Sequence, residues 1–125
     1  MAEQQREVSG PAKPREVTIE NTGFCCDMKA MNKVERERYN QLREKLEKAI
    51  DETKELEDGY AFRWQSGEVS LVELAEWVEK ERKCCPFFDF EIAVEREGGP
   101  MRLALKGKGG VKAFIRMEFG RLNLQ

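Results

Sequence analysis

Two alternating segments joined by a short turn constrain the fold of this chain most. Apolar side chains occupy every second position, at Phe88, Phe90, Ile92 and Val94 in one segment and at Met101, Leu103 and Leu105 in the other. A period of two is typical of strands with one buried face, and the intervening Glu-Gly-Gly-Pro sequence at 97–100 favours a hairpin. The sequence therefore predicts antiparallel strands whose apolar face another layer must cover.

Two segments with helical spacing of their apolar residues are expected to form that layer. A capping box of Asn32 and Glu35 predicts a helix from residue 32 to about residue 56, and a second box of Ser70 and Glu73 predicts another. Pro86 cannot continue the second helix. The expected apolar stripes comprise Leu42, Leu46, Ala49, Ile50 and Thr53 in the first helix, and Leu71, Leu74, Ala75, Val78 and Cys85 in the second.

The remaining elements complete an α+β fold. Tyr60, Phe62 and Trp64 alternate as a strand, residues 16–20 resemble a short edge strand, and residues 111–119 form a short helix. We expect a small antiparallel sheet of three to four strands, with two longer helices and a short C-terminal helix packed on it. Residues 1–15 are expected to be a disordered N-terminal tail, and residues 16–125 a single domain.

Composition narrows the function classes. The net charge of −2 gives no field that would attract nucleic acid, and no run of ~18 apolar residues predicts a membrane span. The N-terminus lacks the apolar stretch of a secretory signal, so we expect a cytoplasmic protein whose thiols stay reduced. The chain has no histidine, which excludes Cys–His dyads and every histidine-containing metal site.

Four cysteines in two vicinal pairs carry the distinctive chemistry. Thiolates are soft ligands, so the pairs favour a thiophilic ion such as Cu(I), Zn(II), trivalent arsenic or mercury. The expected ligands are Cys25, Cys26, Cys84 and Cys85, with Met28 and Glu81 as weaker candidates. One ion can use both pairs only if the loop that carries the first pair folds over the end of the second helix. The leading hypothesis is therefore a non-enzymatic protein that binds a soft metal ion or metalloid.

Three other interpretations remain open. Cysteine often packs as a small hydrophobic residue, and Cys85 falls on the apolar stripe of its helix while Cys84 falls nearer the flank. Glu76, Glu79 and Glu81 are typical of a solvated helix face. A thiol-redox protein would instead use one exposed cysteine of low pKa, with a resolving partner nearby, to act on a thiol-reactive ligand. An interaction module would keep the cysteines in its core and form a homodimer that covers the sheet. Neither pair has the C-x₂₋₄-C spacing of a structural zinc site.

Three stretches resemble a group of small bacterial proteins of undefined function. They are the strand sequence Asp-Gly-Tyr-Ala-Phe-Arg at 58–63 and the motif Glu-Arg-Lys-Cys-Cys-Pro-Phe at 81–87, with Leu-Ala-Glu-Trp at 74–77 between them. The resemblance covers roughly residues 20 to 119 and implies a bacterial, cytoplasmic protein. It assigns no catalytic residue.

Overall fold

The computed structural model describes residues 27–122 and 124 of the chain. Its elements are η2 (Met28–Ala30), α2 (Lys33–Ala49), β1 (Glu52–Leu56), β2 (Gly59–Trp64), α3 (Leu71–Cys84), β3 (Asp89–Val94), β4 (Met101–Lys106), α4 (Val111–Glu118) and η3 (Gly120–Leu122). This arrangement confirms the predicted α+β class. The tail predicted for 1–15, the strand predicted for 16–20, and Cys25 and Cys26 lie outside the described residues.

The strands form one antiparallel sheet in the order β1-β2-β4-β3. The alternating segments pair as expected, with Phe90 opposite Leu105 and Ile92 opposite Leu103, and the connection between them is the predicted hairpin. β4 also pairs with β2, which places Phe62 opposite Leu103. The apolar positions of the three strands therefore share one face of the sheet.

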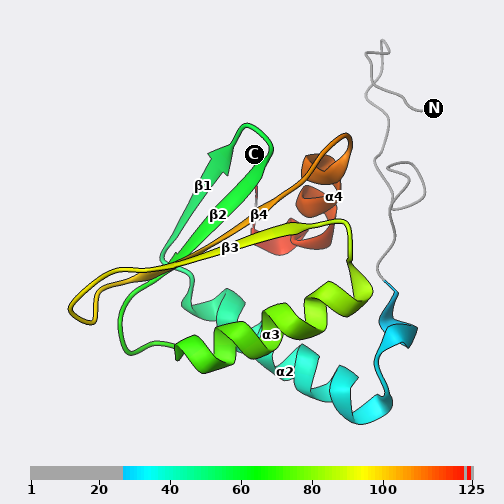
Figure 1. The fold of residues 1–125 in the computed structure, drawn as a ribbon, viewed down its shortest axis with the longest axis horizontal. Helices are drawn as coiled ribbons and strands as arrows, with labels where there is room; N and C mark the ends of the chain where they lie inside the picture. The colour runs from blue at the N-terminus through cyan, green and yellow to red at the C-terminus, as the bar shows by residue number, and fades with distance from the viewer. Residues whose placement is uncertain (1–26, 123, 125) are drawn as a thin grey trace.

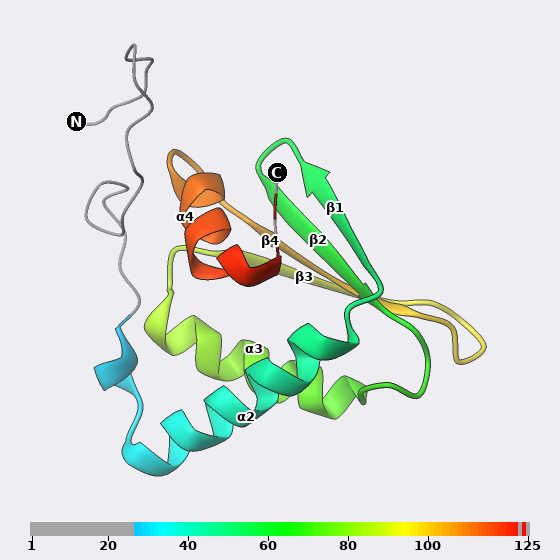
Figure 2. The same cartoon turned by 180° about the vertical axis from the view of Figure 1, so that it is seen from behind.

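All of the labelled α-helices cover that face. Figures 1 and 2 show α2 and α3 side by side beneath the sheet, with α4 next to them. Trp64 on β2 donates from Nε1 to the carbonyl oxygen of Leu46 on α2, at 2.8 Å. The rings of Phe62 and Phe119 lie 6.1 Å apart, which brings the end of α4 onto the same core. The opposite face of the sheet carries half-exposed side chains such as Arg63 and Arg102.

The helices begin where the sequence predicts. Both capping boxes are present, with Asn32 and Glu35 at α2 and Ser70 and Glu73 at α3. Arg38 on α2 binds Glu76 on α3 with two hydrogen bonds of 2.9 and 3.0 Å. Hydrogen bonding from Arg38, with a smaller effect of the hydrogen bond from Lys80, lowers the pKa of Glu76 to about 2. Ion pairs thus join the outer sides of the two helices.

The first helix is shorter than the sequence predicts. It ends at Ala49 because Ile50 adopts an extended backbone, and residues 52–56 form β1 instead of a last helical turn. Thr53, expected on the helix stripe, pairs with Phe62 across the β1–β2 hairpin. Tertiary pairing with β2 overrides local helix propensity here, and the charged side chains of β1 suit an exposed edge strand.

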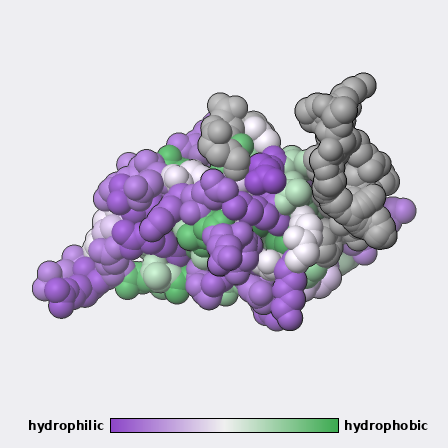
Figure 3. Space-filling view, turned by 90° about the horizontal axis from the view of Figure 1, so that it is seen from above, coloured by the Kyte–Doolittle hydropathy of each residue, from purple (hydrophilic) through white to green (hydrophobic). Residues whose placement is uncertain are grey.

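The face of the molecule seen from above is mostly polar. Figure 3 shows hydrophilic side chains over most of it, with hydrophobic ones near its middle and near the base of the protruding β3–β4 hairpin. Among the described residues, no helix combines the length and the apolar character that a membrane crossing requires.

Candidate metal centre

The centre lies at the C-terminal end of α3, where the apolar stripe of that helix meets Pro86. The side chains that α3 buries recur at helical spacing, at Leu74, Trp77, Val78, Glu81 and Cys84. Cys85 caps the helix, and its backbone N–H donates to the Glu81 carbonyl oxygen at 2.7 Å. Because residues three or four apart lie on one face of a helix, this end of α3 brings Glu81 and the second cysteine pair together.

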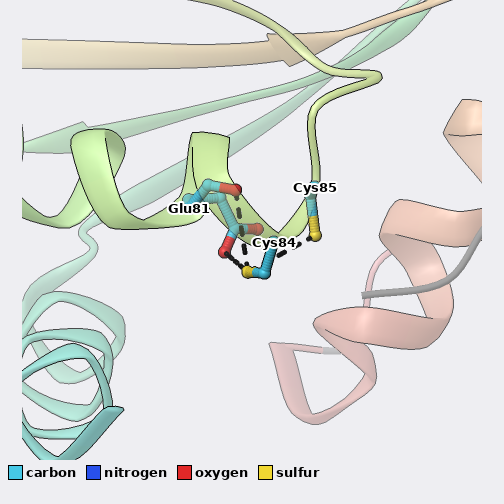
Figure 4. A group of neighbouring side chains, drawn as sticks. All are labelled: Glu81, Cys84 and Cys85. Atoms are coloured by element: carbon cyan, nitrogen blue, oxygen red, sulfur yellow. Dashed lines mark hydrogen bonds between the residues drawn. The ribbon is translucent and has the colours of Figure 1, made fainter. Parts of the chain in front are cut away.

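The three side chains are fully buried and close to one another. Glu81, Cys84 and Cys85 each have 0% relative exposure, and one ligand atom from each lies within 4.8 Å of the others. The Cys84 sulfur is 3.9 Å from the Cys85 sulfur and 3.7 Å from Glu81 Oε1, as drawn in Figure 4. The same sulfur lies 3.6 Å from the Glu81 carbonyl oxygen. The carboxyl group and the two thiols thus form one compact donor cluster.

Tyr39 on α2 holds the Glu81 carboxyl group from the other side. Its hydroxyl donates to Glu81 Oε1 at 2.6 Å, and its ring lies 6.0 Å from that of Trp77 at an interplanar angle of 17°. Burial, and then the charge of Glu81, raises the pKa of Tyr39 well above its usual range. The phenol is therefore a permanent hydrogen-bond donor to the carboxyl group at neutral pH.

The segment before α2 packs against the same end of α3. The backbone N–H of Asp27 donates to the Cys84 carbonyl oxygen at 2.8 Å, and Met31 is buried in the core. Met28, a predicted ligand, is half-buried and packs on the edge of the core. Asp27 and the residues after it therefore lie against the end of α3, whereas Cys25 and Cys26, whose approach to this end the shared site requires, lie outside the described residues.

Two expectations about residues near the C-terminal end of α3 were wrong. Glu81 was expected on a solvated helix face, and Cys84 on the flank of the apolar stripe, yet both are fully buried. The stripe runs through positions 74, 77, 78, 81 and 84, so Glu81 occupies a position that an apolar residue would normally fill. A carboxyl group at such a position requires partners, and Tyr39 and Cys84 supply them.

Two of the three donor distances in the cluster, both measured from the Cys84 sulfur, suit a four-coordinate ion of zinc-like size. With metal–sulfur bonds of about 2.3 Å, a sulfur–sulfur distance of 3.9 Å corresponds to an angle of ~116° at the ion. With a metal–oxygen bond of about 2.1 Å, the 3.7 Å between Cys84 Sγ and Glu81 Oε1 corresponds to ~114°. Both values are close to the tetrahedral angle of ~109° that zinc sites adopt. Within the described part of the chain, Glu81, Cys84 and Cys85 form the group of acidic and cysteine side chains close enough together that it could hold a metal ion.

Comparison of the chain with known protein families, with curated proteins and with solved structures gives no match.

Proposed function

We propose that this protein binds a thiophilic metal ion or metalloid through Cys84, Cys85 and Glu81. The observation that carries the proposal is the fully buried Glu81 carboxyl group beside two fully buried thiols. Cysteine alone in a core is ordinary, because thiols pack well among apolar groups. A carboxyl group in the same place is costly to bury, and ligation of an ion is a function that accounts for both residue types.

The mixed donor set favours an ion of intermediate softness. Thiolates bind soft and borderline ions, whereas a carboxylate oxygen suits harder ones, and Zn(II) accepts both. Cu(I) and mercury would gain less from Glu81 than from a further sulfur. We therefore expect Zn(II), or Cd(II) as its spectroscopic substitute, to bind through all three side chains.

The first cysteine pair is the expected source of a fourth ligand. Cys25 and Cys26 lie outside the described residues, but Cys26 directly precedes Asp27, whose N–H contacts the Cys84 carbonyl oxygen. The Asp27 backbone, one residue along the chain from the first pair, therefore lies beside the end of α3. This connection supports the participation of the first pair, with Met28 as a weaker candidate.

The burial of the second pair weighs against a redox function for it. Redox-active cysteines are accessible thiolates with a resolving partner, since the attacking sulfur must reach its substrate. Cys84 and Cys85 have no exposed surface. A thiol that reacted rapidly with an alkylating reagent in the native protein would favour the redox alternative over ion binding.

Titration with Cd(II) tests the proposal, because thiolate ligation produces a charge-transfer absorption band. The wild-type protein should bind one ion per chain, and Cys84→Ser and Glu81→Gln should each weaken binding. Glu79→Gln, an exposed change two residues away on α3, is the matched control and should bind as wild type does. The double variant Cys25→Ser/Cys26→Ser then reports whether the first pair contributes. An absent thiolate band in the wild-type protein, or equal binding by all variants, would overturn the proposal.

A further inference from the structure

The candidate metal centre is closed to solvent. Glu81, Cys84 and Cys85 are fully buried, so an ion or a reagent reaches them only when a neighbouring segment moves aside. Three described segments lie against this end of α3. They are the helix α2, the turn at 86–88, and residues 27–31 before α2, which we call the strap.

Core packing fixes α2 and the turn. The helix α2 buries Leu42 and Leu46 in the core. Phe87 and Phe88 in the turn place their rings 5.0 and 5.8 Å from the ring of Phe114 on α4. Movement of either segment would bring large apolar side chains into water, which is unfavourable in proportion to the apolar area exposed. Neither segment therefore offers an easy route to the centre.

The strap is held by fewer contacts. Its 3₁₀ helix, η2, has no fully buried side chain, and Met28 packs on the edge of the core. At one end, the backbone N–H of Asp27 donates to the carbonyl oxygen of Cys84 at 2.8 Å. At the other end, Met31 is buried, and its carbonyl oxygen accepts a 2.7 Å hydrogen bond from Arg36 Nη1. Figures 1 and 2 show this segment beside the C-terminal end of α3. The strap thus has a firm end at Met31, and a backbone hydrogen bond holds its Asp27 end on α3.

We infer that the strap is a gate over the metal centre, hinged at Met31 and Asn32, whose Asp27 end moves away from α3 to admit an ion. The inference rests on the proposed function. Met31 and Asn32 join η2 to α2 through extended backbone, which suits a hinge. Opening breaks the bond to the Cys84 carbonyl oxygen and leaves the sheet and the long helices in place, so it is a local event and not global unfolding. The closed strap shields a bound ion from water and slows its release.

Alkylation of the metal-free protein tests the gate, because it needs no ion. The test uses the Cys25→Ser/Cys26→Ser background, in which Cys84 and Cys85 are the remaining thiols. Asp27→Pro removes the N–H that bonds to the Cys84 carbonyl oxygen, and the loss of one hydrogen bond should make alkylation about 2–10-fold faster. Asp27→Ala, which keeps that N–H, is the matched control and should react at close to the background rate.

Ser70→Ala separates local opening from a general loss of stability. It removes the N-cap at the opposite end of α3 and so destabilises the whole fold. If the strap is the route, this variant alkylates at the background rate, and the rate rises little with urea before unfolding begins, because a local opening exposes little surface. Equal rates for Asp27→Pro and Asp27→Ala would overturn the inference. So would a Ser70→Ala protein that reacts as fast as Asp27→Pro, or a rate that rises steeply from the lowest urea concentrations.

Stopped-flow mixing with Cd(II) extends the test to an ion. In the same background, the thiolate band should appear faster in Asp27→Pro, by the same factor as alkylation. Cd(II) that binds Asp27→Pro at the background rate would overturn the gate and leave the metal centre intact. Faster alkylation in a protein that never develops a thiolate band would support the strap as a gate over the two thiols and overturn the proposed function instead.

Discussion

Removal of the Tyr39 hydroxyl tests how the centre is held in place. Tyr39→Phe keeps the ring that stacks on Trp77 and deletes the 2.6 Å hydrogen bond to Glu81 Oε1. A hydrogen bond to a charged group contributes about 1.5–3 kcal/mol, and a buried oxygen that loses its donor costs a similar amount. We therefore expect the free energy of unfolding to fall by about 2 kcal/mol.

The assays are urea denaturation and thermal unfolding of the metal-free protein, followed by a Cd(II) titration. A loss of about 2 kcal/mol lowers the melting temperature by roughly 10 °C in a domain of about 100 residues. Because an outer partner orients its ligand, the affinity for the ion should also fall by about 10–100-fold. A Tyr39→Phe protein whose stability stays within about 0.5 kcal/mol of wild type, with unchanged affinity, would refute this account of the site.

A double-mutant cycle separates the contact from general effects on folding. Glu81→Gln keeps a carbonyl acceptor of similar size but removes the anionic ligand. If Tyr39 acts through Glu81, the effects of the two substitutions on ion affinity should be non-additive, with a coupling free energy of about 0.5–3 kcal/mol. Strict additivity would show that Tyr39 stabilises the protein without orienting the ligand.

Two further predictions concern the scaffold. The pKa of Glu76 is lowered to about 2, chiefly by the hydrogen bond from Arg38. The ionised Glu76 therefore stabilises the folded protein above pH 4.5, the pKa of glutamate in the unfolded chain, and this stabilisation is lost as the pH falls toward 2. Because both side chains are partly exposed, the contribution is about 0.2–1 kcal/mol, and Glu76→Gln should remove that part of the acid dependence in urea titrations from pH 5 to about pH 2. Gly59→Ala should destabilise the sheet by more than ~2 kcal/mol, because a Cβ at that position would lie 1.9 Å from the Leu105 carbonyl oxygen. Gly120→Ala, where a Cβ meets nothing within 4 Å, is the control, and equal thermal melts for the two variants would contradict the argument.

Most of the fold was predictable because periodicity and caps agree along the chain. The alternation in β3 and β4 and the two capping boxes fixed the type and the start of the main elements. The strand β1 was missed because Glu, Lys and Thr at 52–56 carry no apolar alternation and follow directly on a helical pattern. Only the pairing with β2, which lies further along the chain, makes that segment extended.

The candidate site was predictable in part. The vicinal pair before Pro86 predicted the end of the helix, and α3 does end at Cys84, with Cys85 as its cap. Glu81 was only a weaker candidate ligand, because glutamate on a charged helix usually faces solvent, and its burial was not predicted. The spacing of 74, 77, 78, 81 and 84 did contain the signal, since it places Glu81 in the middle of the buried stripe. Tyr39 could not be predicted, because its contact with Glu81 joins residues 42 positions apart and depends on how α2 packs on α3.

X-ray absorption spectroscopy of the zinc-loaded protein tests the central claim most directly. The claim is that Cys84, Cys85 and Glu81 bind one ion together, so the Cys25→Ser/Cys26→Ser variant is the informative sample. Its spectrum should contain two sulfur neighbours at about 2.3 Å and oxygen neighbours at about 2.0–2.2 Å. Glu81→Gln in the same background should lose or lengthen an oxygen contribution while both sulfurs remain. A first shell of oxygen or nitrogen alone, with no sulfur from the second pair, would contradict the claim.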